Sequence, residues 1–222
     1  MQNELLLVED LMLLMTDDES GAIAGEGTLY YTLGGAVLVE LSLGQYVSVD
    51  PGDMSLSGVK VHAVAGASLP DPLLQRAHDT VAKRPRGVQG LLAEIGTGLR
   101  PVVLERLVER GMLRQEKKKW LGVIPSTSTT VANTAYKKAL VEEVRAVLLD
   151  DAEPDARTAA LVGLLSASGT LPSLHRAIPW SGKVYKRAKE LEQSSWGAEA
   201  VNSAVMRTMA AISAGSAAAV TN

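Results

Sequence analysis

The sequence contains no cysteine and no phenylalanine, and it has only three histidines among its 222 residues. Without cysteine the chain forms no disulfide and offers no thiolate to a metal or a substrate. His62, His78 and His175 lie far apart and lack ligand spacing, so we expect no metal site. Aliphatic residues and methionine must therefore supply nearly all of the core.

Motifs for catalysis are absent as well. The sequence has no nucleophile elbow, P-loop, dinucleotide-binding glycine motif or zinc motif. Acidic residues cluster at 17–19 and 150–151, but both clusters fall at expected loops or helix ends, where carboxylates are usually solvated. We therefore expect no catalytic residues, no cofactor and no enzymatic activity, and we interpret the chain as a binding protein.

Long hydrophobic runs are also missing. The most apolar run, from Glu4 to Met15, is interrupted by Glu9 and Asp10 and is shorter than the ~20 residues of a membrane span. It is better interpreted as a buried helix. The first residues are acidic instead of basic, which argues against a secretory signal. We expect a cytoplasmic protein.

Charge is unevenly distributed along the chain, although the net charge is only −3. Residues 1–75 carry eleven acids and a single basic residue, Lys60, whereas residues 76–119 carry eleven Lys and Arg and five acids. A chain polarised in this way can orient toward an anionic surface. The alternative is that these segments mix in space and that the charges simply cover solvated faces.

A helix followed by a basic hairpin is the best candidate for contact with a partner. Pro101 suits the first turn of a helix, and Gly111 can end it with a positive φ. A charged turn is expected over residues 116–119, followed by a strand that begins with Trp120. Such a unit could contact nucleic acid or an anionic membrane.

Helices dominate the remainder of the chain. Short strands are expected at 46–49 and 58–64, joined by a turn at 51–53, and residues 29–33, 83–87 and 125–130 are expected to be irregular. The expected helices are 4–15, 34–44, 73–82, 88–95, 132–149, 154–167, 183–192 and 197–214, with a frayed tail at 213–222. These predictions describe a mainly α fold, a single compact helical domain over residues 1–222 with short β-hairpins.

Five blocks of the sequence, taken in order, resemble the Golgi phosphoprotein 3 family in the form seen among bacterial relatives. The resemblance runs from about residue 4 to residue 212. The blocks are Leu5–Leu14 with Asp17–Gly21, Leu33–Leu43, the strand pair with Asp71–Leu74, Leu104–Leu113, and Glu116-Lys117 with Trp120-Leu121.

The resemblance implies a mostly helical domain with one protruding β-hairpin. It also implies a peripheral membrane protein that recognises phosphatidylinositol 4-phosphate. In the eukaryotic members the headgroup pocket uses a Trp and three Arg, the hairpin aids membrane contact and self-association, and cytoplasmic tails of glycosyltransferases are bound.

Carried onto this sequence, the family's Trp falls near Gly25, and its three Arg fall on Gly34, Pro101 and Leu104. Arg100 lies one position before Pro101, and Arg106 belongs to the shared Leu104–Leu113 block. We predict Arg100 and Arg106 as lipid-headgroup-binding residues. The predicted membrane-contact hairpin comprises Lys117, Lys118, Lys119, Trp120 and Leu121.

The sequence thus favours a peripheral membrane protein whose partner is an anionic lipid, with a phosphoinositide as one candidate. A winged-helix nucleic-acid binder is an alternative, but the helix at 103–110 carries two Glu and no Asn or Gln to read base edges. A scaffold that binds protein clients and forms a homo-oligomer through the hairpin is a third hypothesis, compatible with the first.

Overall fold

A computed structural model describes residues 5–55, 58–120, 124–195 and 198. Residues 50–55, 58, 117–120 and 124–128 are described through their backbone alone. The predicted helix at 197–214, apart from Ala198, and the predicted tail at 213–222 lie outside the described residues.

Two helices form the centre of the molecule, α1 (Leu7–Met15) and α2 (Leu29–Leu43). All nine residues of α1 are buried, including Glu9 and Asp10. A helix that is apolar around most of its circumference must be covered on every side, and α1 contacts α2, α5, α6 and α7. The expectation of a buried helix in this region is confirmed.

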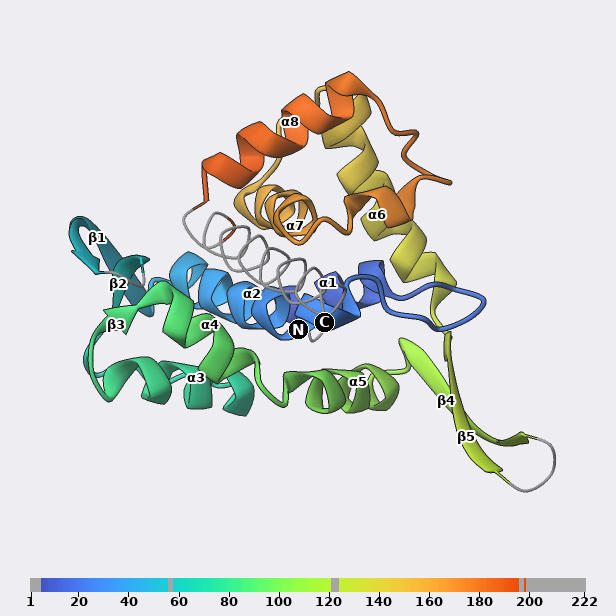
Figure 1. Cartoon of the computed structure of the whole chain (residues 1–222), viewed down its shortest axis with the longest axis horizontal. Coiled ribbons are helices and arrows are strands. Elements are labelled where there is room, and N and C mark those ends of the chain that lie inside the picture. The colour runs from blue at the N-terminus through green and yellow to red at the C-terminus, as the bar shows by residue number, and fades with distance from the viewer. Residues whose placement is uncertain (1–4, 56–57, 121–123, 196–197, 199–222) are drawn as a thin grey trace, which may run out of the picture.

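Helices cover this central pair on two sides (Figure 1). On one side lie α3 (Pro72–Ala82), α4 (Val88–Gly96) and α5 (Leu99–Glu109). On the other side lie α6 (Thr134–Leu149), α7 (Ala156–Ala167) and α8 (Gly182–Gln193). Short 3₁₀ turns lie in two of the connections, η1 (Glu26–Thr28) between α1 and α2 and η2 (Leu171–Leu174) between α7 and α8. The mainly α fold is confirmed.

The first third of α2 differs from the sequence prediction. We predicted an irregular link at residues 29–33, but α2 begins at Leu29. This segment contains no helix breaker, and Leu29 and Leu33 are both buried, four residues apart on one helical face. Burial of that face against the core extends the helix by a full turn.

A small antiparallel sheet lies at one end of the molecule, in the strand order β1 (Val47–Ser55), β2 (Gly58–Ala63) and β3 (Arg86–Gly87). The predicted hairpin is confirmed, but its turn is not at 51–53, because these residues continue β1 through a register shift between Val49 and Met54. Such irregularities are where strands tolerate proline and glycine. Arg86 and Gly87, expected in a loop, pair with β2.

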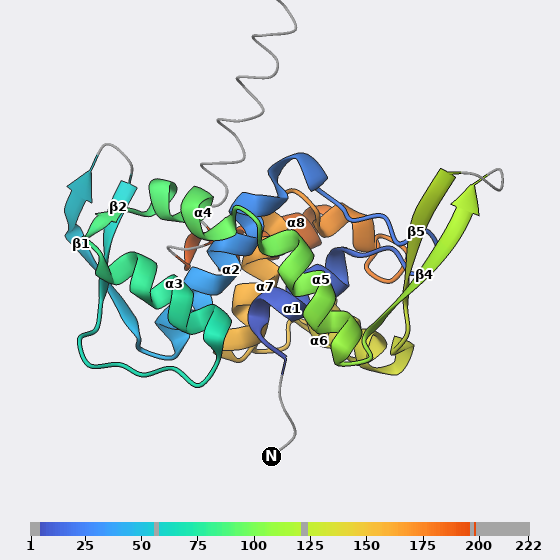
Figure 2. The same cartoon turned by 90° about the horizontal axis from the view of Figure 1, so that it is seen from below.

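A second hairpin, β4 (Leu113–Trp120) and β5 (Ile124–Val131), projects away from the helices at the opposite end (Figure 1, Figure 2). Its register runs from Leu113 opposite Val131 to Trp120 opposite Ile124. The predicted turn at 116–119 and the predicted loop at 125–130 are wrong, since both lie within the strands. Charged residues suit a solvated ribbon, and the β-branched Thr127, Thr129 and Thr130 favour its second strand.

Two helix ends show how local residues define the helices, and the positive φ expected at Gly111 is confirmed. The Asp71 carboxylate caps α3 by accepting from the backbone N–H groups of Leu73 and Leu74, and Pro72 occupies the first turn. Gly111 has φ +69° directly after the end of α5. Among the described helices, none combines the length and the hydropathy required to cross a bilayer.

Candidate functional site

Arg100 lies on the first turn of α5 and makes an exposed ion pair. Its Nη2 is 3.0 Å from Glu26 Oε1 in η1, and the side chains are 50% and 65% exposed. Exposed pairs of this kind contribute little to stability, because water screens both charges. An anionic ligand could therefore compete with Glu26 for Arg100 at little cost.

Arg106, two turns later on α5, is held inside the protein by two carboxylates. Its Nε donates to Glu9 Oε1 over 2.8 Å, and its Nη2 donates to Asp71 Oδ2 over 2.6 Å. Glu9 is fully buried and also accepts from the Leu6 N–H. Arg106 thus joins α1, the N-cap of α3 and α5. A headgroup would have to displace a buried carboxylate to reach it, and its contact with lipid stays a prediction.

The structure does not bring Arg100 and Arg106 into one pocket. Arg106 and Arg76 line a cavity of about 370 Å³ between α3, α4 and α5, and Arg100 is not among its lining residues. Asp71 neutralises Arg106 at the edge of this cavity. Arg76 is exposed and is thus the cation of this cavity that remains available to solvent.

The basic hairpin contains all but one of the predicted membrane-contact residues. Lys117, Lys118, Lys119 and Trp120 form the outer half of β4, opposite residues 124–127 of β5. Leu121 lies outside the described residues. Within β4 and β5 the only acid is Glu116, while Arg114 and the three lysines are basic. Strand pairing therefore concentrates positive charge on a projecting ribbon.

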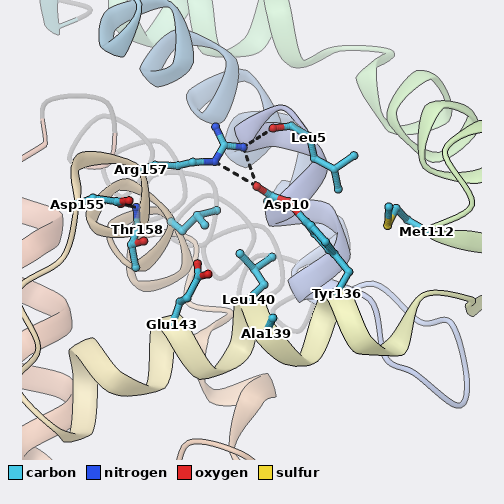
Figure 3. Close-up of a pocket in the computed structure, with 11 residues that line it drawn as sticks. Leu5, Asp10, Met112, Tyr136, Ala139, Leu140, Glu143, Asp155, Arg157 and Thr158 are labelled. Carbon is cyan, nitrogen blue, oxygen red and sulfur yellow. Dashed lines mark hydrogen bonds and ion pairs between the residues drawn. The ribbon is translucent and has the colours of Figure 1, made fainter. Parts of the chain in front are cut away.

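A larger cavity, of about 750 Å³, lies between α1, α6 and α7 (Figure 3). It is lined by Leu5, Asp10, Met112, Tyr136, Ala139, Leu140, Glu143, Asp155, Arg157, Thr158 and Leu161. Figure 3 shows Arg157 extending from α7 toward Asp10 and Leu5, and Tyr136 reaching Asp10 from α6. Side chains from three helices thus meet at its wall.

Arg157 is the centre of this polar cluster. Its Nη2 donates to Asp10 Oδ2 over 2.6 Å and to the Leu5 carbonyl, and its Nη1 lies 3.2 Å from Glu40 Oε1 on α2. Glu40 also accepts from the Leu7 N–H. This contact explains the single acid within the apolar run of α2, since Glu40 pairs both with a guanidinium and with the start of α1.

Burial shifts the pKa of the acids around Arg157. It raises the pKa of Asp10 and of Glu40, while Arg157 acts on both groups in the opposite direction. Burial and the Asp10 carboxylate likewise raise the pKa of Tyr136, whose hydroxyl donates to Asp10 Oδ1 over 2.8 Å. Tyr136 therefore stays a neutral hydrogen-bond donor at physiological pH.

Two further carboxylates give this cavity an acidic character. Burial and the nearby Asp155 and Asp10 raise the pKa of Glu143. Hydrogen bonds from Thr158 lower the pKa of Asp155, which caps α7. Three carboxylates and one already paired guanidinium therefore line the cavity. This charge balance is unfavourable for an anionic lipid headgroup.

Comparison with protein families identifies the chain. The model of the Golgi phosphoprotein 3 (GPP34) family matches residues 7–208, which is most of its length. The chain belongs to this family. A search among curated proteins found no match.

In this Golgi phosphoprotein 3 family member, two of the three positions onto which the family's headgroup arginines fall, Gly34 and Leu104, lie in the packed interior, whereas the third, Pro101, is exposed. Gly34 lies where α2 crosses α4, and a Cβ added to it would lie 2.3 Å from the Leu92 carbonyl oxygen. Leu104 is buried in the core. An arginine side chain has no room at Gly34, so the described residues do not form an arginine pocket at these positions.

Sequence reasoning missed the Arg157 cluster. Asp10 is 126 positions from Tyr136 and 147 positions from Arg157 in the sequence. No local spacing therefore connects these residues. The only sequence signal was an acid within an apolar run, at Glu9, Asp10 and Glu40. Buried acids require a partner, but the sequence does not say which cation supplies it.

Proposed function

We propose that this Golgi phosphoprotein 3 family member is a peripheral membrane protein that binds anionic lipid headgroups through the β4–β5 hairpin. The observation that carries the proposal is the concentration of four basic residues on one strand that projects from the helical body. A lysine near an anionic leaflet contributes about 1 kcal/mol. Trp120, in the same strand, is a residue type that favours the membrane interface.

The exposed Arg100 is a secondary candidate for headgroup contact, because its Glu26 partner is also exposed. We propose a predominantly electrostatic interaction, since two of the positions that correspond to the family's arginines are occupied by Gly34 and Leu104 in the packed interior. Selective recognition of phosphatidylinositol 4-phosphate would require Arg100 to act together with residues other than those at positions 34 and 104.

Vesicle sedimentation with charge-matched lipids tests the proposal. Phosphatidylcholine vesicles containing phosphatidylserine should bind the protein as well as vesicles of equal surface charge containing phosphatidylinositol 4-phosphate, and binding should weaken with added salt. A marked preference for the phosphoinositide would contradict the electrostatic form of the proposal. Binding to neutral vesicles alone would contradict the proposal altogether.

A pair of charge-reversal variants locates the contact. K117E/K118E/K119E should weaken binding by roughly 100-fold or more, from about 1 kcal/mol per lysine. The matched control, R76E/K83E/R84E, reverses the same number of charges on exposed residues on and directly after α3. We expect a much smaller effect of the control. Equal losses would show that the hairpin has no special role.

A further inference from the structure

Two exposed aromatic side chains lie where the segment after η2 enters α8, Trp180 just before the helix and Tyr185 within it. Trp180 is 50% exposed and Tyr185 is 52% exposed. Their ring centroids are 6.2 Å apart in an edge-on arrangement. Large aromatic residues are usually well buried in folded proteins, so a pair that packs together while remaining half exposed needs an explanation.

This aromatic pair rests on an ordered support. Ile178, two residues before Trp180, is 2% exposed and anchors the loop in the core. Ser181 caps α8 by accepting from the Val184 N–H, and Val184 is fully buried. The neighbouring residues are therefore fixed by packing and capping, which keeps Trp180 and Tyr185 at the surface.

The segment of the sequence that carries the pair is basic. From residue 156 to residue 189 the sequence contains six Lys and Arg and no acid. Several of these cations have acidic neighbours, such as Lys183 with Asp151 and Arg187 with Glu190. Lys186, directly after Tyr185, is exposed and makes no ion pair with any described residue. An exposed aromatic pair beside an available lysine is complementary to the surface of an anionic bilayer, where apolar lipid chains lie beneath negatively charged headgroups.

The position of the loop supports the same partner. In Figure 1 the segment between η2 and α8 bends outward on the side from which the β4–β5 hairpin projects, and it then leads into the first turns of α8, where Tyr185 and Lys186 lie. Two weak contact sites on one rigid body can bind the same surface together. Once the first site is bound, the second binds at a high effective concentration. A single anionic bilayer would satisfy both.

We propose that Trp180, Tyr185 and Lys186 form a second membrane-contact site, which binds the interface of an anionic bilayer together with the hairpin. The inference rests on the proposed function, since it adds a second contact with the same membrane. The aromatic rings lie at the level of the headgroups, and the Lys186 ammonium contacts lipid phosphates.

Binding of full-length variants to phosphatidylcholine–phosphatidylserine vesicles tests this inference. W180S/Y185S should weaken binding by about tenfold, from the loss of exposed apolar area that the bilayer would cover, and K186E should weaken it by about fivefold or more. The control L43S removes a 43% exposed hydrophobic side chain from the end of α2 that leads into β1. It should bind as the unchanged protein does.

The outcomes separate this inference from the proposed function. If K117E/K118E/K119E weakens binding and W180S/Y185S does not, the second site is refuted while the hairpin proposal stands. If only W180S/Y185S weakens binding, the hairpin proposal fails and the aromatic site stands. A change in light-scattering mass caused by W180S/Y185S without lipid would instead assign the aromatic pair to contact between copies of the chain, and would overturn the inference.

Discussion

Arg157 connects four points of the core through one guanidinium, because it contacts Asp10, Glu40 and the Leu5 carbonyl while its own backbone belongs to α7. Asp10 is only 1% exposed and has no access to bulk water as a substitute partner. Removing one member of a buried ion pair leaves the other as an uncompensated charge, which is far more costly than losing an exposed pair.

We therefore expect R157M to lower the free energy of unfolding by about 3–5 kcal/mol. The control R145M, at a 39% exposed arginine on α6 that pairs with Glu142 and Asp150, should change it by less than about 1 kcal/mol. Urea unfolding followed by circular dichroism measures both. A loss at Arg157 no larger than that at Arg145 would mean that the cluster does not stabilise the core.

Glu143 gives a prediction for pH. The pKa of Glu143 in the folded protein is raised by burial and by Asp155 and Asp10. At pH values above the ordinary pKa of 4.5, Glu143 is therefore protonated to a greater extent in the folded protein than in the unfolded chain. Stability from this group is complete below its unfolded pKa and is lost as the pH rises through its folded pKa.

E143Q removes this titration and should flatten the fall in stability with rising pH that begins near the ordinary value of 4.5. Because the Glu143 side chain is exposed, its desolvation is only partial, and water screening limits the stabilisation that E143Q gives at neutral pH to under about 1 kcal/mol. Urea midpoints measured across this pH range provide the test. A parallel shift of the whole profile, with the slope unchanged, would contradict the raised pKa.

At the scale of elements, the α2–α4 crossing depends on two glycines. A Cβ on Gly34 would lie 2.3 Å from the Leu92 carbonyl oxygen, and one on Gly96 would lie 1.7 Å from the Tyr30 carbonyl oxygen. Both obstacles are backbone atoms, which cannot move aside as a flexible side chain can. The two helices therefore approach as closely as they do only because each has a glycine at the contact.

G34A should destabilise the protein by about 2 kcal/mol or more, since the methyl group forces these helices apart. The control G90A lies on the same α4, where an added Cβ meets nothing within 4 Å. It should stabilise the protein by about 0.5–1 kcal/mol, because alanine favours a helix over glycine. Thermal unfolding of both variants measures the difference. Equal effects at the two glycines would contradict the close crossing.

At the scale of the whole molecule, the hairpin and the helical body have separate tasks. The body buries the apolar faces of α1 and α2, whereas the outer part of β4 and β5 projects beyond it (Figure 2). Stability and membrane contact should therefore be separable by shortening the hairpin.

Replacing residues 116–128 by Asn-Gly would join Gln115 directly to Thr129, which already face each other across the hairpin. We expect the melting temperature to change by less than about 4 °C, which corresponds to under 1 kcal/mol, while vesicle binding is largely lost. Calorimetry and sedimentation measure the two effects. Unchanged vesicle binding would contradict the hairpin proposal, and a collapse in melting temperature would show that the hairpin supports the body.

Local chemistry in the sequence predicted much of the fold. The positive φ at Gly111 and the buried helix α1 follow from neighbouring residues alone. The predictions failed where pairing partners are remote. Residues 116–119 and 125–130 appear polar and turn-like locally, yet they form strands because each supplies the other's backbone hydrogen bonds.

The sequence by itself determined the mainly helical class, the absence of thiol chemistry and the presence of a basic hairpin after α5, because these depend on composition and short-range spacing, whereas the extent of the hairpin's strands did not follow from it. Only the tertiary structure decided how the arginines are used. It paired Arg106 with Glu9 and Asp71, left Arg100 in an exposed pair, and placed Arg157 among buried acids. The physical reason is that an ion pair depends on distance in space, and the partners here are brought together by helix packing between distant parts of the chain.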